Sequence, residues 1–351
     1  MKIHKNLFLS LILLFSISSY SYSQVDKQKI KEAGFSYFSI KDNVNDIDSV
    51  RFIASGSLIE KKAMLLFIQG SGNQPIIFYD DTSSFPITIS SIPPQFYEKY
   101  HIVIISKPGI PVCLPYSENQ NFMNQNSGDY HTFIRHNNLD YYVESANQVI
   151  DYLSTFQFID TQHIFVVGHS QGYPVIAKLT ALYPEKIKKA VCMSSSPFDR
   201  QSGFIRAIRL KQEMGLITSE LAQNKIDSLY ERYNYIKNGY EELLKQKSYD
   251  SMNFYHFKND YSFNFDPPIN YMLKINTPLL VVYGTKDPVS YDNDLLPLFF
   301  SRANKSNLTI KCYPNYDHNY VCRQYDNDGN IVKTEYNWFK VFEDIDIWLN
   351  N

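Results

Sequence analysis

Residues 165–174, FVVGHSQGYP, decide how this sequence is interpreted, because they join an apolar strand to a helix through a tight turn. Gly168, Ser170 and Gly172 stand at alternate positions of the pattern G-x-S-x-G. In a turn of this kind the glycines leave room where strand and helix cross, and the serine hydroxyl is exposed at the C-terminal edge of the sheet. The following segment, YPVIAKLTALYP, is predicted as a helix because a first turn tolerates Pro174. The stretch therefore predicts an exposed serine on a strand–turn–helix elbow.

Short apolar runs on both sides of this turn predict a parallel sheet. The runs AMLLFI, HIVIIS, HIFVVG, KAVCMS and PLLVVYG are typical of strands covered on both faces, and LTIKCY is a sixth, more alternating strand. Apolar residues at helical spacing over 139–153 and 338–348 indicate helices. FSYFSI and SVRFIASG predict an antiparallel hairpin at the edge. The fold class expected is α/β, with a doubly wound and mostly parallel sheet.

Two segments interrupt this alternation. Residues 107–138 are rich in Asn, Gln and Tyr and are expected to form a long loop, which either lines a site or is disordered. Residues 199–268 have helical patterns without a buried strand, which predicts a helical cap inserted between core segments 24–198 and 269–351. The aromatic residues of this cap either line an acyl or aryl pocket or pack between its helices; they include Tyr230, Tyr233, Tyr235, Phe254 and Tyr255.

Composition and the first residues restrict the class of protein. The 351 residues are 44% hydrophobic and carry a formal net charge of −2, so the basic excess expected of a nucleic-acid-binding protein is missing. Lys2 and Lys5 precede the apolar run LFLSLILLFSIS, and a small-x-small triplet follows with serines at 21 and 23. This order predicts a signal peptide over residues 1–23 and an exported chain with no membrane span after cleavage. An uncleaved anchor is the alternative, although the apolar run is short for a full span.

Cysteines and most histidines suggest no metal chemistry. Cys192 and Cys312 lie inside predicted core strands and are expected as buried free thiols. His101, His163 and His256 lack the spacing of metal ligands. We therefore expect neither a metal nor a cofactor.

Partners for Ser170 follow two later strands. A serine hydroxyl needs a base to accept its proton, and His318 comes after the strand LTIKCY. Asp287 comes after the strand PLLVVYG, and Asp292 and Asp294 in the same loop are alternatives. The C-terminal ends of parallel strands meet at one edge, so the serine, acid and histidine are expected to converge there. His169, next to the serine, is expected to point away and pack.

An oxyanion hole, which would stabilise a developing negative charge, is predicted at the end of a third strand. Residues 65–75, LLFIQGSGNQP, end a strand in a flexible glycine-containing turn. The backbone N–H groups of Ser71 and Gln171 are the predicted oxyanion donors, with Gly72 as the alternative to Ser71.

Together these motifs resemble the α/β-hydrolase-fold serine hydrolases over nearly all of the chain after residue 23. The matching stretches are GHSQG, QGSG, GTKDP and YDHN. The resemblance implies that Ser170 is the nucleophile, Asp287 the acid, His318 the base, and that Ser71 and Gln171 form the oxyanion hole. Gln69 stands where a histidine often precedes the glycine, which leaves the subfamily open.

The expected reaction is acyl transfer to Ser170 followed by hydrolysis, on a small-molecule or peptide substrate. Carboxylic esters are the first expectation, since export disfavours cytoplasmic acyl-CoA thioesters. An aminopeptidase-like serine peptidase is an alternative, and so is a non-catalytic binding protein on the same fold. Glutamates of the cap are the candidates for holding a substrate amine in the peptidase; they are Glu213, Glu220, Glu231, Glu241 and Glu242.

Overall fold

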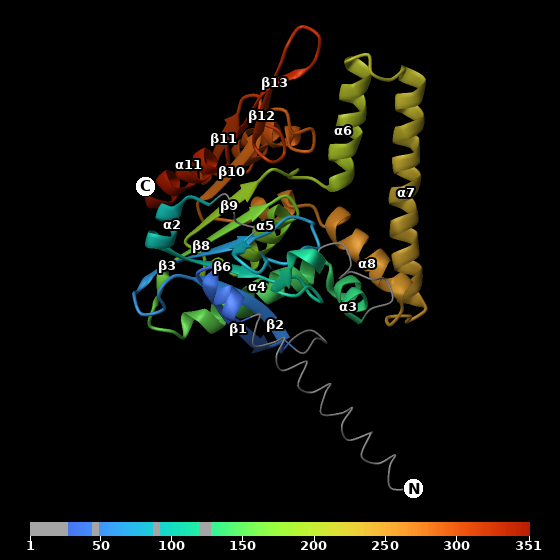
Figure 1. Ribbon diagram of the computed structural model, residues 1–351. Helices are drawn as coiled ribbons and strands as arrows, with labels where there is room; N and C mark the ends of the chain where they lie inside the picture. The colour runs from blue at the N-terminus through green and yellow to red at the C-terminus, as the bar shows by residue number, and fades with distance from the viewer. Residues whose placement is uncertain (1–26, 44–48, 87–91, 119–127) are drawn as a thin grey trace, which may run out of the picture.

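An eight-stranded sheet forms the centre of the computed structural model, which describes residues 27–43, 49–86, 92–118 and 128–351 (Figure 1). From one edge to the other the strands are β1 (Phe35–Lys41), β2 (Ser49–Ser55), β6 (Tyr100–Ile105), β3 (Lys62–Ile68), β8 (Ile159–His169), β9 (Lys189–Met193), β10 (Leu279–Gly284) and β11 (Leu308–Tyr313). β1, β2 and β6 pair antiparallel, and all pairs from β6 to β11 are parallel. The six core strands and the edge hairpin are confirmed.

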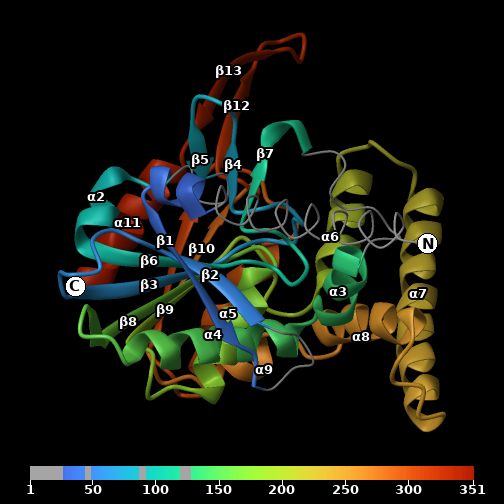
Figure 2. The same ribbon diagram turned by 60° about the horizontal axis from the view of Figure 1, so that its bottom comes forward.

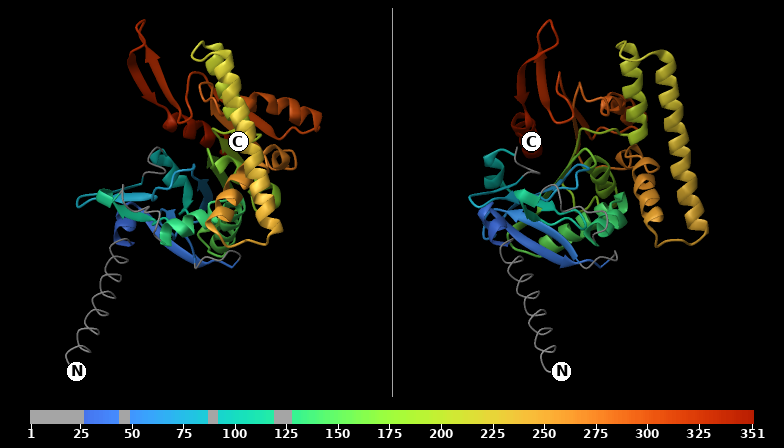
Figure 3. Two further views of the ribbon diagram at one scale, coloured as in Figure 1. Left: turned by 90° about the vertical axis from the view of Figure 1, so that its right-hand side faces the viewer. Right: turned by 45° about the vertical axis from the view of Figure 1, so that its right-hand side comes forward.

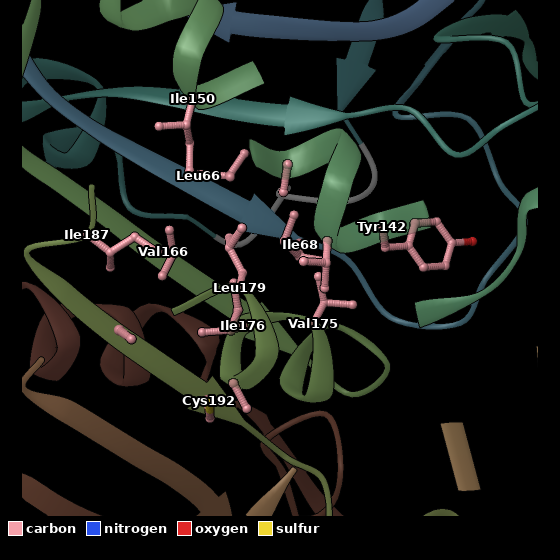
Figure 4. Close-up of a cluster of buried hydrophobic side chains, with 14 of the residues drawn as sticks. Leu66, Ile68, Tyr142, Ile150, Val166, Val175, Ile176, Leu179, Ile187 and Cys192 are labelled. Atoms are coloured by element: carbon pink, nitrogen blue, oxygen red, sulfur yellow. The ribbon is translucent and has the colours of Figure 1, made fainter. Parts of the chain in front are cut away.

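Helices cover both faces of this sheet. α4 (Leu139–Ser154), α5 (Gly172–Leu182), α9 (Ile269–Met272) and α10 (Leu296–Arg302) pack on one face, and α2 (Pro94–Lys99) and α11 (Trp338–Asn350) on the other. Alternate residues of β3 separate the two cores, with Leu66 in one and Leu65 in the other. Figure 4 shows Val175 and Ile176 of α5 packed toward β3 and β8. The predicted doubly wound α/β fold is therefore confirmed.

Three further helices lie between β9 and β10, within residues 199–268. α6 (Arg200–Glu213) and α7 (Ser219–Lys245) run side by side beyond the edge of the core, and α8 (Met252–Asn264) returns toward it (Figure 3). Asp199 and Ser202 form a capping box that starts α6. An ion pair of 2.5 Å between Arg206 and Asp292 ties α6 to the core.

Several elements were not expected from the sequence. The predicted loop at 107–138 contains β7 (Cys113–Pro115), the 3-10 turn η1 (Tyr116–Glu118) and α3 (Gly128–His136). β7 joins β4 (Ile77–Tyr79) and β5 (Ser84–Pro86) in a small second sheet (Figure 2). A second 3-10 turn, η2 (Tyr291–Leu295), precedes α10.

The largest element that the sequence did not predict is a projecting β-hairpin. β12 (Val321–Tyr325) and β13 (Ile331–Tyr336) follow the loop that carries His318, so LTIKCY is not the last strand (Figure 1). Gly329, with φ +84°, lies in the turn of this hairpin.

Cys192 is buried as expected, but the expectation for Cys312 was wrong. Its side chain is exposed because β11 is the edge strand and only one of its residues is buried. All four cysteines are free thiols. The predicted signal peptide lies outside the described residues. Within the described ranges, no helix is long and apolar enough to cross a bilayer.

Candidate active site

Ser170 lies at the apex of the turn between β8 and α5, in a backbone conformation that few non-glycine residues adopt. Its φ is +55°, in the left-handed region. The Ser170 N–H donates to the carbonyl of Met193 at 2.9 Å, and the Ser170 carbonyl accepts the N–H of Tyr173 at 3.0 Å. These two bonds hold the strained turn in place, so that the hydroxyl stands at the end of β8.

The glycines on either side allow this geometry. A Cβ at Gly168 would lie 2.3 Å from the carbonyl oxygen of Gly172, and one at Gly172 would lie 2.2 Å from the carbonyl oxygen of Ile68. Real Cβ atoms do not approach backbone this closely, so any larger residue would separate α5 from the sheet. The close crossing that the sequence predicted is present.

His318 connects the serine to a buried carboxylate. The Ser170 hydroxyl is 3.0 Å from His318 Nε2, and His318 Nδ1 donates to Asp287 Oδ2 at 2.9 Å. Asp287 is 1% exposed and is held by two further donors, the Ser290 hydroxyl at 2.5 Å and the Val289 N–H at 3.2 Å. The three predicted residues are therefore in one hydrogen-bonded chain.

The two other acids of the Asp287 loop have different partners. Asp292 pairs with Arg206 of the cap. Asp294 accepts a hydrogen bond from the hydroxyl of Tyr283. Asp287 is the carboxylate in contact with the histidine.

The predicted oxyanion donors border the serine. Ser71 and Gln171 line the same pocket as Ser170 and His318, whereas Gly72 is not among its lining residues. Gln171 is the N-cap of α5, so its N–H belongs to the group that has no acceptor inside the helix. A Cβ at Gly70 would lie 3.3 Å from Cβ of Ser170, which shows how closely this turn approaches the nucleophile.

His169 makes a contact that sequence reasoning missed. Its side chain is buried and packs on the Trp338 ring at 4.9 Å, as expected, but its Nε2 also donates to the backbone carbonyl of His318 at 3.0 Å. Burial lowers the pKa of His169 to about 4, with the nearby His318 as a smaller cause. A neutral His169 therefore anchors the loop that carries His318.

Lys107 is a second residue that was missed. It is only 4% exposed, its Nζ donates to Oε1 of Gln171 at 2.8 Å, and it lies over the Tyr142 ring at 5.4 Å. Burial, with a smaller contribution from the positive charge of Arg200, lowers the pKa of Lys107 to about 7. The available signal was its position directly after the strand run HIVIIS, at the edge where the site was predicted.

The pocket above Ser170 has a volume of about 310 Å³ and lies between core and cap. Asp199, Arg200, Phe204 and Phe263 form its cap side. None of the five singled-out cap aromatics lines it: Phe254 and Tyr255 pack in a separate cluster, and Tyr233 stacks on Phe265. The pocket interpretation was wrong for those five residues: Tyr233, Phe254 and Tyr255 pack against other aromatic rings, whereas Tyr230 and Tyr235 are more than half exposed.

The five candidate glutamates are also absent from this pocket. They lie along α6 and α7 with exposed or partly exposed side chains. In the described part of the chain, no group of three metal-binding side chains is present.

A mostly parallel eight-stranded sheet, a strained serine elbow and a cap between β9 and β10 define an α/β-hydrolase fold. Residues 131–299 match the family described as alpha/beta hydrolase fold. The chain therefore has the α/β-hydrolase fold, as the sequence predicted.

Solved structures with the same fold have low sequence identity to this chain. A putative dipeptidyl aminopeptidase IV from Bacteroides ovatus matches with a TM-score of 0.50 and 12% identity, over 90% of this chain and 35% of that one. This chain thus spans about a third of that protein. An acylaminoacyl peptidase from Pyrococcus horikoshii (TM-score 0.47, 13% identity, 82% and 38% covered) and the alpha/beta hydrolase GrgF from Penicillium sp. (0.49, 14%, 90% and 95%) are also similar. No curated protein matches by sequence search.

Proposed function

We propose that the protein is a serine hydrolase that cleaves a carboxylic ester through an acyl-enzyme on Ser170. The observation that carries the proposal is the continuous contact from the Ser170 hydroxyl through His318 to Asp287, at 3.0 and 2.9 Å. Both distances are within the reach needed for proton transfer and for orienting the imidazole. A non-catalytic binding protein would not need this contact.

The mechanism follows from what each group can do. His318 Nε2 takes the Ser170 proton as the oxygen attacks the ester carbonyl, and Asp287 stabilises the imidazolium that forms. The N–H groups of Ser71 and Gln171 stabilise the negative oxygen of the tetrahedral intermediate. The imidazolium then protonates the leaving alcohol. A water molecule, deprotonated by His318, releases the acyl group and restores the free serine.

A fluorophosphonate probe tests the nucleophile directly. We expect the wild type to be labelled, Ser170→Ala to be unlabelled, and Ser195→Ala, which removes another serine of the same pocket, to remain labelled. Absence of labelling on the wild type, or persistent labelling of Ser170→Ala, would overturn the proposal.

A serine peptidase is the second candidate, since one protein with the same fold is named as an aminopeptidase. The position of the cap glutamates argues against the amine-binding arrangement that the sequence suggested. Rates on 4-nitrophenyl esters of increasing chain length, compared with aminoacyl 4-nitroanilides, separate the two candidates. A preference for anilides with a free amine would replace the ester assignment.

Export by the segment 1–23 remains part of the proposal. N-terminal sequencing of the protein recovered from its native cells should find the mature chain starting near Gln24. A chain that retains Met1 in a membrane fraction would favour the uncleaved anchor instead.

A further inference from the structure

Arg200 is the arginine of the pocket that contains Ser170. It is the first residue of α6, its side chain is solvent-accessible, and it lines the pocket together with Ser170 and His318. Its guanidinium lies 6.0 Å from the ring centroid of Phe263, another wall of the same pocket. A positive charge and an apolar wall are thus placed within one small cavity beside the nucleophile.

Among the described residues, no carboxylate pairs with this guanidinium. Two other arginines of the cap do have acidic partners: Arg206 pairs with Asp292 at 2.5 Å, and Arg232 pairs with Asp260 at 3.5 Å. Asp260 interacts with Arg200 only through its charge, because the Asp260 carboxylate forms its ion pair with Arg232.

The acid next to Arg200 is engaged elsewhere. Asp199 also lines the pocket, but its carboxylate accepts the Ser202 N–H at 2.8 Å as the N-cap of α6. Burial raises the pKa of Asp199 above its usual value. The pocket therefore presents a fork of N–H donors that no internal acid satisfies.

A second cation lies behind the nucleophile. Lys107 is bound to the side chain of Gln171, the residue after Ser170, and in the described structure it also has no carboxylate partner. The positive charge of Arg200 contributes to the lowered pKa of Lys107. Lys107 is not among the residues that line the pocket, so a ligand there would meet Arg200 rather than Lys107.

We propose that the substrate is an ester that carries a carboxylate, which Arg200 binds while Phe204 and Phe263 contact the short apolar chain between carboxylate and ester. The planar guanidinium can bind both oxygens of a carboxylate at once. This inference rests on the proposed esterase function and names its substrate class.

Two pairs of matched esters test the substrate class by kcat/KM. In the first pair the carboxylate is on the acyl side: mono-4-nitrophenyl glutarate against its methyl-capped diester. In the second it is on the leaving group: 4-(butyryloxy)benzoate against its methyl ester. We expect the charged member of at least one pair to be favoured by about tenfold or more, as hydrogen bonds to a charged group allow. Equal rates within both pairs would overturn the inference.

Variants of α6 then assign the preference to one residue. Arg200→Gln should lower kcat/KM on the charged ester far more than on the neutral ester, so that the preference is lost, and Arg200→Lys should keep part of the preference. Arg209→Gln is the matched control, because Arg209 lies on the same helix and binds Gln212 and Gln223 outside the pocket. A preference that survives in Arg200→Gln would overturn the inference.

A binding measurement separates this inference from the proposed function. Calorimetry with Ser170→Ala and mono-4-nitrophenyl glutarate should show binding that is lost when Arg200→Gln is added. Binding of this kind without any esterase activity in the wild type would refute the esterase proposal alone. Hydrolysis of neutral esters without binding or preference for the charged ones would refute only the carboxylate site.

Discussion

Replacing Gly172 by alanine should destabilise the whole fold, because the added methyl group has no space. Its Cβ would lie 2.2 Å from the carbonyl oxygen of Ile68 and 3.0 Å from the carbonyl carbon. Both atoms belong to the backbone of β3, so the contact is relieved only by moving strand and helix apart. Overpacking costs about 1–3 kcal/mol, and we expect the upper end here. Alanine's better helix propensity returns about 1 kcal/mol at most, which leaves a net loss of about 2 kcal/mol.

Urea unfolding followed by far-UV circular dichroism measures this loss as a lower transition midpoint and a lower extrapolated free energy of unfolding. Gly72→Ala is the matched control, because no heavy atom lies within 4 Å of its added Cβ. We expect the control to stay within about 0.5 kcal/mol of the wild type. The reasoning would be refuted if Gly172→Ala had the same urea midpoint as the wild type, or if Gly72→Ala lost as much free energy of unfolding as Gly172→Ala.

Three further predictions concern the charged and titrating groups. Asp287→Asn should lower kcat on an ester by about four orders of magnitude, because the imidazole loses its orienting acceptor; a drop of less than tenfold would contradict its assigned role. The wild type should lose up to about 3 kcal/mol of unfolding free energy as the pH falls from 6.5 to about 4, because the unfolded chain protonates His169 while the fold keeps it neutral. Urea titrations at several pH values should show a smaller loss in His169→Gln, and an identical loss would count against a buried neutral imidazole. For Lys107, the folded pKa of about 7 lies below the ordinary 10.5, so its contribution to stability rises with pH between these values, by at most about 5 kcal/mol. The free energy of unfolding of the wild type relative to Lys107→Met should therefore increase from pH 7 to 9.5. A difference that stays constant over this range would show that burial does not lower the pKa of Lys107.

The residues of the hydrogen-bonded chain were predictable because position on the sheet determines where they meet. Ser170, Asp287 and His318 each follow a parallel strand of the central sheet, and such strands present their C-terminal ends along one edge. The strands themselves were recognisable as short apolar runs. No side-chain detail was needed for either inference.

The β12–β13 hairpin was missed because it has no buried run. Ile331 and Val332 are more than half exposed, so the apolar residues there do not indicate a core strand. The Asp328–Gly329 pair in its turn was the one local signal.

Side-chain contacts between elements far apart in the chain could not be predicted from the sequence. His169 reaches the backbone of His318, 149 residues away, and Lys107 reaches Gln171, 64 residues away. Which cap aromatics face the pocket also depends on how α6 and α8 rotate against the core, and so Phe204 and Phe263 line it instead of the residues expected. Such pairings are set by tertiary packing, which periodicity does not encode.

The positive φ of Ser170 means that the proposed nucleophile has a strained backbone conformation. Glycine would adopt the same backbone without the strain of about 1–3 kcal/mol that a side chain incurs there. Laboratory evolution for heat tolerance alone would therefore favour a glycine at residue 170 and yield a sturdier protein that has lost its hydroxyl.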